Sequence, residues 1–335
     1  MAFYENIHLE KGMYGTGKNF SQVLEALDNS ENYRGTPLEG LDAYQRQLKR
    51  FDIHVSGRGS DRVEKFFQTG DSAALFPEYI CRAVRQGMEQ ENLLPSIVAT
   101  TTQVEGMDYR TITSTPLEEE KKLKTVAEGA AIPQTVVRTQ DHLVQLHKRG
   151  RMLVASYEAL RFQHLDLFTV TLRQIGAYIA RAQMGDAVQV LLNGDDGTDK
   201  AEEVTAAGAV TYKDLLQVWG KLAPYRMNCL LGGTAAVQQV LGLAEMRDAQ
   251  AGLNFQGTGK LVAPMGAQLL HVPDVPDGKL IGIDHTCALE MVQAGDVQTE
   301  YDKLIDRQLE RASISTIAGF TKIFSGAVKV LGYTA

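Results

Sequence analysis

Residues 165–194, LDLFTVTLRQIGAYIARAQMGDAVQVLLNG, decide the fold. Apolar residues recur there at intervals of three and four, at Leu165, Phe168, Leu172, Ile175, Ile179 and Ala182. This spacing is that of one face of an α-helix. No proline interrupts residues 157–192, and Asn193-Gly194 is a typical helix end. The pattern predicts one helix of about 30 residues, roughly 45 Å long. Such a helix is far longer than usual and would serve as a structural spine.

The residues before this helix predict a shorter helix followed by a projecting β-arm. A helix over residues 77–95 carries an apolar stripe formed by Ile80, Val84 and Met88. Residues 96–115 and 134–155 are rich in strand-forming residues, and the mixed-charge run 118–124 lies between them. Such a run is typical of a solvated loop tip. Because a lone two-stranded ribbon is marginal in water, we expect the arm to lie against another subunit.

Residues 1–72 form a distinct N-terminal segment with two short apolar patches. The first patch has helical spacing and comprises Leu41, Tyr44, Leu48 and Phe51. The second comprises Val63, Phe66 and Phe67. Neither patch is long enough to fold alone. We therefore expect this segment to pack on the main body of the chain or on a neighbouring copy.

After the long helix, residues 193–208 predict a polar linker, and the chain then alternates helix and strand. Helices are predicted over residues 212–221, 234–241 and 285–293, and strands over residues 228–231, 267–272 and 279–284. Thr211 and Asp214 form a capping box for the first of these helices, and Thr234 is expected to cap the second. This order indicates a compact α/β unit.

The C-terminal residues 313–331 return to β-type sequence and need a partner in a sheet. The extended region 96–115 is the candidate partner. Such a pairing would close one domain from both ends of the chain around the inserted α/β unit.

The composition is that of an ordinary globular protein of two or three packed units. The chain has 335 residues, of which 44% are hydrophobic and 22% charged, and its net charge is −7. Nucleic-acid binders usually carry a basic excess, so this charge argues against a dedicated nucleic-acid-binding protein. The N-terminus lacks the pattern of a signal peptide, and no apolar run could span a membrane. We expect Cys81, Cys229 and Cys287 to be reduced and mostly buried, because their wide spacing fits no disulfide framework.

Two stretches resemble catalytic motifs without matching them. Residues 12–19, GMYGTGKN, nearly match the phosphate-binding loop GxxxxGK[ST], but Asn19 lacks the hydroxyl that holds Mg²⁺. Asp284, His285 and Cys287 could suggest a thiol nucleophile with its base. Residues so close in sequence rarely reach that geometry, and a helix start with a buried cysteine is the preferred interpretation. We predict no catalytic or cofactor-binding residue.

The candidate metal ligands are equally unconvincing. His142 and His147 are five residues apart on an expected strand and would face opposite sides of it. Asp195, Asp196 and Asp199 resemble a calcium loop, but in the wrong register and without its final glutamate. The sequence therefore predicts no metal site.

Taken in order, these elements resemble the major capsid protein of tailed bacteriophages, whose fold is that of Hong Kong 97 (HK97). Residues 127–133, AEGAAIP, resemble the family's EGA-x-x-P segment, and residues 154–160, VASYEAL, resemble its V-x-S-x-E-x-L start of the spine helix. Residues 193–198, NGDDGT, resemble its NGDGT exit from that helix, with one additional Asp. The resemblance extends over about residues 73–333. It implies an α+β, HK97-like capsid fold with an N-terminal arm, a projecting β-hairpin E-loop, a long spine helix in the P domain and an α/β A domain.

The resemblance also implies domain boundaries. The N-terminal arm would be residues 1–72, the P domain residues 73–102, 155–204 and 301–335, the E-loop residues 103–154, and the A domain residues 205–300. In some family members a segment like residues 1–72 is a scaffolding domain that a protease removes. In others it remains as an arm that ties capsomers together, and the sequence leaves both possibilities open.

The implied function is self-assembly, as pentamers and hexamers, into an icosahedral shell around the double-stranded DNA of a phage or prophage. Assembly would occur in the bacterial host cytoplasm, with portal and scaffolding or decoration proteins as partners and without cofactor, membrane or enzymatic activity. Contacts between copies are expected at the arm and at a central loop, from Glu118, Glu119, Glu120, Lys121, Lys122, Lys124, Glu128, Asp248, Asn254 and Lys260. Two alternatives remain: an encapsulin-type shell around enzyme cargo, and a nucleotide-binding enzyme that uses residues 12–19.

Overall fold

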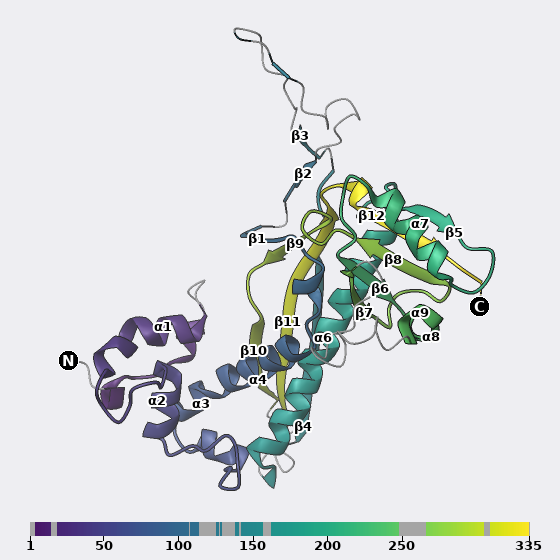
Figure 1. Cartoon of the computed structure of the whole chain (residues 1–335). Helices are drawn as coiled ribbons and strands as arrows, with labels where there is room; N and C mark the ends of the chain where they lie inside the picture. The colour runs from purple at the N-terminus through teal and green to yellow at the C-terminus, as the bar shows by residue number, and fades with distance from the viewer. Residues whose placement is uncertain are drawn as a thin grey trace. The chain divides into compact units, whose positions relative to one another are not determined.

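The fold is mixed α and β, and its parts are grouped in two compact units (Figure 1). The structure is a computed structural model that describes residues 4–14, 19–106, 108–113, 125–126, 128, 138–140, 142–156, 162–247, 266–304 and 309–334. Unit 1 comprises Met1–Glu91, Lys148–Arg181 and Gly295–Thr316, and unit 2 comprises Asn92–His147, Ala182–Ala294 and Ile317–Ala335. Helix α6 (Leu165–Asn193) and strand β11 (Leu309–Lys322) run from one unit into the other.

Unit 1 combines the N-terminal helices with the first part of α6 and a small piece of sheet. Its other helices are α1 (Phe20–Leu27), α2 (Ala43–Arg50), α3 (Gly70–Ala74) and α4 (Phe76–Glu91). Short 3₁₀ helices lie at Tyr4–Asn6, Lys11–Tyr14, Ser30–Tyr33 and Val63–Phe67. Strand β10 (Gln298–Leu304) pairs antiparallel with β11, from Gln298 opposite Ser315 to Leu304 opposite Leu309. Strand β4 (His147–Ser156) also pairs with β11.

Helices α4 and α6 confirm the two strongest helical patterns of the sequence. On α4 the predicted stripe is buried at Ile80 and Val84, and on α6 it is buried at Leu165, Leu172, Ile175 and Ile179. Helix α6 begins at Leu165, and residues 157–161 of the proline-free stretch lie outside the described part of the chain. Gly194, with a φ of +83°, follows its last residue as predicted.

The N-terminal segment packs on the main body of the chain, which was one of its two expected partners. One core contains Phe20, Leu24, Tyr44, Val63 and Phe66 from this segment together with Phe76, Tyr79, Leu165 and Leu172. The rings of Phe66 and Tyr79 lie 5.4 Å apart. The short apolar patches therefore gain their stability from tertiary packing rather than from their own length.

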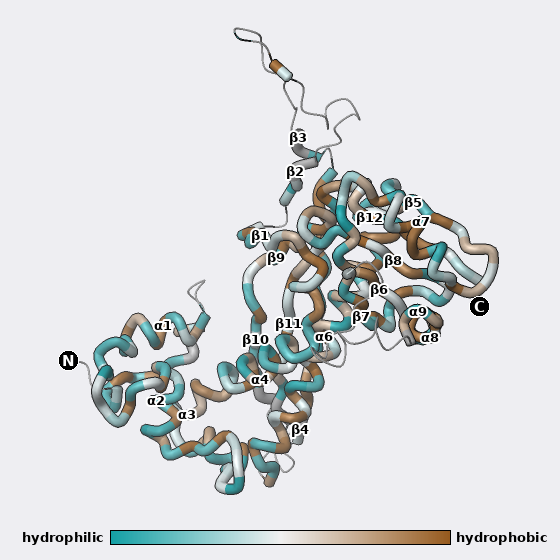
Figure 2. Tube along the Cα trace, viewed as in Figure 1, coloured by the Kyte–Doolittle hydropathy of each residue, from teal (hydrophilic) through white to brown (hydrophobic). Residues whose placement is uncertain are grey.

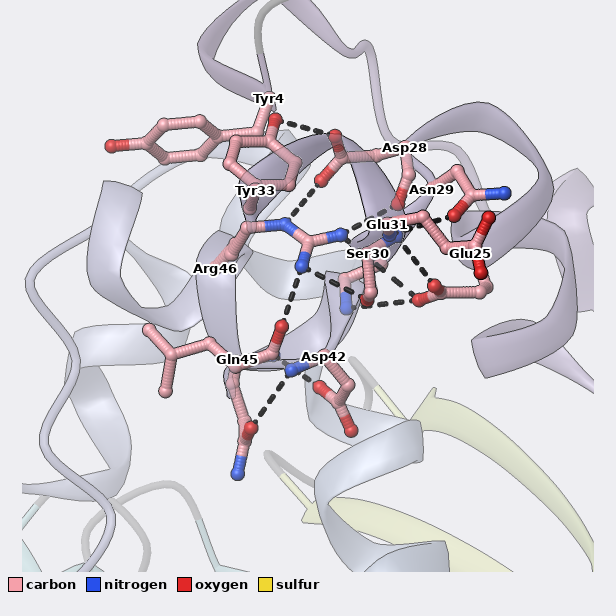
Figure 3. A network of polar contacts seen from close by, with 12 residues as sticks. Tyr4, Glu25, Asp28, Asn29, Ser30, Glu31, Tyr33, Asp42, Gln45 and Arg46 are labelled. Carbon is pink, nitrogen blue, oxygen red and sulfur yellow. Dashed lines mark hydrogen bonds and ion pairs between the residues drawn. The ribbon is translucent and has the colours of Figure 1, made fainter. Parts of the chain in front are cut away.

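A buried ion pair fixes this segment internally (Figure 3). Arg46 is 0% exposed, and its Nε donates to Asp28 Oδ2 at 2.6 Å. Its terminal nitrogens donate to the carbonyls of Asp28 and Leu41 and to the Ser30 hydroxyl. The guanidinium also lies 4.2 Å from the centre of the Tyr33 ring. The charge is thus fully compensated, which a buried arginine requires.

Unit 2 contains a five-stranded sheet covered by short helices. The strand order is β5 (Glu202–Thr205), β12 (Val328–Gly332), β8 (Lys279–Ile283), β6 (Cys229–Gly232) and β7 (Gln268–His271). Helix α7 (Tyr212–Leu222) contacts β12, β8 and β5, while α8 (Thr234–Gly242) contacts β6, β7 and α9 (Ala244–Arg247). Figure 2 shows hydrophobic residues concentrated along the central strands, in agreement with the fully buried β6. The predicted α/β alternation and the Thr211–Asp214 capping box are confirmed.

A second set of strands in unit 2 corrects two predictions. Strand β9 (Leu289–Ala294) occupies most of the residues predicted as a helix over 285–293. It pairs with β1 (Thr100–Val104) on one side and with Ala318–Lys322 of β11 on the other. The C-terminal strand therefore reaches the 96–115 region only through β9, and not directly as expected. Residues 288–292 are all buried. A short run of buried residues shows neither the alternation of a strand nor the three-to-four spacing of a helix, so the sequence could not distinguish the two.

Two local expectations were also wrong. The predicted linker 193–208 contains β5, an edge strand in which only Val204 is buried, so its apolar signal was too weak to detect. The N-cap of α8 is Gly233, and Thr234 is the first helical residue, whose hydroxyl instead contacts His271 Nε2 at 2.9 Å.

The three cysteines are free, with Cys81 and Cys229 buried and Cys287 half-buried, as predicted. Burial raises the pKa of Cys81 to about 11 and that of Cys229 to about 12. Among the described residues, no helix combines the length and the apolarity needed to cross a bilayer.

Candidate functional site at the base of the β2–β3 ribbon

Two chain segments leave the sheet of unit 2 side by side and form the base of a two-stranded ribbon. Strands β2 (Ile112–Thr113) and β3 (Arg138–Thr139) are antiparallel, with Ile112 opposite Thr139. The pairing continues below them, where the Gln140 N–H donates to the Thr111 carbonyl and the Val144 N–H to the Tyr109 carbonyl, both at 2.9 Å. We call residues 109–113, 138–140 and 142–144 the ribbon base. Its existence is consistent with the predicted β-arm.

A buried carboxylate on β9 holds the ribbon base to the sheet. Glu290 is 4% exposed and accepts hydrogen bonds from the hydroxyls of Thr102 at 2.5 Å, Tyr109 at 2.8 Å and Thr111. Burial and the adjacent Glu290 carboxylate raise the pKa of Tyr109. Hydroxyls from β1 and from the segment that enters the ribbon thus converge on one side chain. The geometry fixes where the ribbon leaves the sheet.

The returning segment lies against β11. The Thr321 hydroxyl and Gln140 Oε1 are 3.4 Å apart, and Gln140 Nε2 lies 3.5 Å from the Lys322 carbonyl. Gly319 has no side chain at the point where this segment crosses, and a Cβ there would overlap the Gln145 carbonyl oxygen. Gly319 therefore permits a close approach that any other residue would prevent.

A polar cluster joins the returning segment to the loop after α6. His142 Nε2 lies 3.0 Å from Asp195 Oδ2, and His142 Nδ1 lies 3.8 Å from Asp196 Oδ2. Lys322, at the end of β11, also contacts this loop, because its Nζ donates to the Asp199 carbonyl at 2.5 Å. Burial lowers the pKa of Lys322, although the Asp199 carboxylate opposes this shift. The histidine and the two aspartates are the residues that could hold a metal ion in the described part of the chain.

The described part of unit 1 carries a different kind of surface. Leu167, Val170 and Tyr178 are 60%, 57% and 49% exposed, and their spacing places them on one side of α6. Strand β4 of the same unit exposes Met152 and Val154. Large apolar side chains on a helix face that no other segment covers are typical of a contact with another molecule.

Most residues proposed from sequence as interface residues lie outside the described part of the chain. These are Glu118, Glu119, Glu120, Lys121, Lys122, Lys124, Asp248, Asn254 and Lys260. Glu128 is described and is exposed at a turn. Glu290 was not predicted as a functional residue, and its only signal in the sequence is its position as an acidic residue inside the apolar run from Leu289 to Val292.

The near-matches to catalytic motifs have structural roles. Asn19 caps α1 through a capping box with Gln22, while residues 15–18 lie outside the described part of the chain. Asp284 closes a turn before β9 by accepting the Cys287 N–H on its carbonyl, so it does not begin a helix. Burial and the neighbouring Asp284 raise the pKa of the Cys287 thiol, which disfavours the reactive thiolate.

The chain matches the sequence model of one protein family and the fold of several solved structures. A family model described as phage capsid protein matches residues 139–317. Among curated proteins, none matches the sequence. The capsid of a native GTA particle, computed with C5 symmetry, is 18% identical, with a TM-score of 0.53 over 72% of this chain and 90% of that chain. A virus-like particle from Pyrococcus furiosus is 12% identical, with a TM-score of 0.53 over 76% and 98% of the two chains. A chain from Microbacterium phage Oxtober96 is 10% identical, with a TM-score of 0.50 over 73% and 91%.

Proposed function

Because the chain belongs to the phage capsid protein family and has an HK97-like fold, we propose that it assembles as pentamers and hexamers into a closed icosahedral shell around double-stranded DNA. The family match carries this proposal, since residues 139–317 include the returning segment of the ribbon base, α6 and most of unit 2. Proteins of this family are structural, so the chain is a component of a virion capsid and not an enzyme. The resemblance seen in the sequence is confirmed.

We assign residues 103–154 to an E-loop that overlaps an adjacent subunit. The support is the ribbon base, in which a short antiparallel pair leaves the sheet at Glu290. A two-stranded ribbon of this kind gains little stability in water, so a neighbouring copy offers the surface that it needs. The charged residues 118–122 and 124, together with Glu128, would then contribute polar contacts with that neighbour.

The remaining domains follow the same proposal. Residues 73–102, 155–204 and 301–335 would form the P domain, and residues 205–300 the A domain. The loop from Asp248 to Lys260, with Asn254, would meet its copies around the symmetry axes. Many weak polar contacts of this type become strong through repetition and closure of the shell.

The exposed face of α6, formed by Leu167, Val170 and Tyr178, would be covered by a neighbouring copy. Burial of apolar area stabilises a contact by about 25 cal/mol per Å². This face would therefore provide the hydrophobic part of the interface between copies. The chain's net charge of −7 implies that enclosed DNA is held without a dedicated binding surface. A portal protein and scaffolding or decoration proteins would complete assembly in the bacterial host cytoplasm.

Negative-stain electron microscopy of the purified protein after size-exclusion chromatography tests this proposal. We expect uniform closed shells for the wild type and for Val170→Leu, which keeps the apolar area. Val170→Asp should remain folded, because the side chain is exposed, but should fail to close shells. Shells that form equally well with Val170→Asp would remove this face from the interface. Particles that enclose protein cargo rather than DNA would instead favour the encapsulin-type alternative.

A further inference from the structure

We propose that His142 and Asp196 bind a divalent metal ion of the zinc class, with Asp195 orienting the histidine, and that this ion fastens the ribbon base to the loop after α6. One ligand atom from each residue lies within 4.8 Å of the others. His142 and Asp195 are 53 positions apart in the sequence, so the ion would join two separate segments of unit 2. The inference goes beyond the proposed shell and does not depend on it.

The contacts of the His142 ring give its two nitrogens different roles. Nε2 lies at hydrogen-bonding distance from Asp195 Oδ2, 3.0 Å, whereas Nδ1 lies 3.8 Å from Asp196 Oδ2. A neutral imidazole carries a proton on only one nitrogen. When Nε2–H donates to Asp195, Nδ1 keeps a lone pair beside the Asp196 carboxylate, which is itself an acceptor. A cation between these two electron-rich atoms would remove their repulsion and bind both.

The ligand chemistry and the dimensions fit such an ion. Imidazole nitrogen with carboxylate oxygen is a ligand set that zinc accepts readily. Metal–ligand bonds of about 2.0–2.2 Å place neighbouring ligand atoms roughly 3–3.6 Å apart, so only a small movement of the exposed Asp196 is needed. Asp195, whose side chain is 6% exposed, would accept the other ring N–H and orient the ligating histidine.

The surroundings also favour a cation. Asp195 lines a cavity of about 250 Å³ together with Asp186, whose carboxylate adds to the negative charge near the cluster. Asp199 adds a third carboxylate to the loop after α6, while the cations are Lys200 in this loop and Lys322, 3.7 Å from the Asp199 carboxylate. The loop therefore has more negative than positive charge.

The proposal is tested by calorimetric titration of the full-length, chelator-treated protein with zinc chloride. We expect one saturable site per chain and a melting temperature that rises with zinc concentration, because the ion binds only the folded state. His142→Ala and Asp196→Asn should each weaken binding at least about tenfold, and Asp195→Asn by about 10–100-fold as an orienting residue. His147→Ala is the matched control, since it removes a neighbouring imidazole outside the cluster, and its affinity should equal that of the wild type.

The same titration can overturn the inference. Zinc binding that persists unchanged in both His142→Ala and Asp196→Asn would place the ion elsewhere. Absence of saturable binding to the wild type at millimolar zinc, manganese or nickel would show that the cluster is an ion pair only. Asp196 is exposed, so the Asp196→Asn chain should fold even if His142→Ala does not. Circular dichroism of each variant provides that check. Failure to assemble shells has no bearing on these readouts.

Discussion

At the scale of single residues, Asp284 shows how one carboxylate organises the turn between β8 and β9. Its Oδ1 accepts from the Asn228 amide at 2.8 Å and from the Thr286 hydroxyl at 2.6 Å, and its Oδ2 accepts from the Arg226 N–H at 2.9 Å. Burial alone would raise the pKa of Asp284, but the hydrogen bonds from Thr286, Arg226 and Asn228 outweigh it and lower the pKa. The ionised form is therefore the one that the fold requires.

We expect Asp284→Asn to destabilise unit 2 by about 1–3 kcal/mol, because an amide cannot accept all of these hydrogen bonds and leaves buried donors unpaired. The pH dependence follows from the lowered pKa. The contribution of Asp284 is present above its unfolded-state pKa and is lost as the pH falls through its folded-state pKa. Urea unfolding at neutral and acidic pH should show a weaker acid dependence for the variant. Asp277→Asn, at an exposed carboxylate before β8, should leave both properties unchanged.

A second prediction at this scale concerns Glu290. Glu290→Gln should loosen the ribbon base, because the amide nitrogen cannot accept hydrogen bonds from the Thr102, Tyr109 and Thr111 hydroxyls. Hydrogen exchange should then become faster at residues 109–113 while the five-stranded sheet keeps its protection. The exposed Glu300→Gln on β10 is the control. Equal protection of residues 109–113 in both variants would mean that Glu290 does not hold the ribbon.

The contacts of these residues could not be predicted from the sequence. The partners of Glu290 lie about 180 positions away in the chain, at separations of 188, 181 and 179 residues. His142 was assigned to a strand, and its contact with Asp195 arises only because the returning segment crosses the end of α6. Polar contacts between residues far apart in the chain leave no local pattern in the amino-acid sequence. The cysteines were easier to interpret, since their wide spacing already indicated reduced, mostly buried thiols.

At the scale of elements, α4 and the first part of α6 depend on two glycines where they cross. A Cβ on Gly87 would overlap the Arg173 carbonyl, and a Cβ on Gly176 would overlap the Val84 carbonyl. Gly176→Ala should therefore force the helices apart and lower the melting temperature of unit 1, in spite of the higher helix propensity of alanine. Gly220→Ala in α7 has open space around it and should stabilise the protein by about 0.5–1 kcal/mol. Calorimetry of the two variants compares the effects directly.

Long helices whose apolar residues recur at regular intervals were predictable from the sequence. Strands that form only because a neighbouring strand pairs with them were not. Helices α4 and α6 carry apolar residues at helical intervals, so the spacing of Ile80 and Val84, or of Leu172 and Ile175, identified them. Strand β9 is buried on both faces between β1 and β11, and its sequence fits a helix equally well. Strand β5 buries only Val204 and exists because β12 pairs with it.

At the scale of the whole molecule, the described part of residues 1–72 belongs to a folded unit. Phe20, Tyr44 and Phe66 share one core with Tyr79 and Leu165. A loosely attached arm would keep few buried apolar contacts of this kind. This packing supports the hypothesis that the segment is retained in the mature particle, because its removal would expose the apolar surface of α4.

The last prediction tests whether the N-terminal segment and unit 1 fold together. Asp28→Ala leaves the Arg46 guanidinium buried without its counter-charge, a change that typically costs about 3–5 kcal/mol. If the segment is integral to unit 1, calorimetry should show a lower unfolding temperature for the whole of unit 1, with hydrogen exchange accelerated as far as α4. Glu31→Ala removes only an exposed pair with Arg34 and should change little. Faster exchange confined to α1 and α2, with α4 still protected, would instead identify a separable arm. In that case the interpretation as a removable scaffolding domain would be preferred, since its loss would leave the core of unit 1 intact.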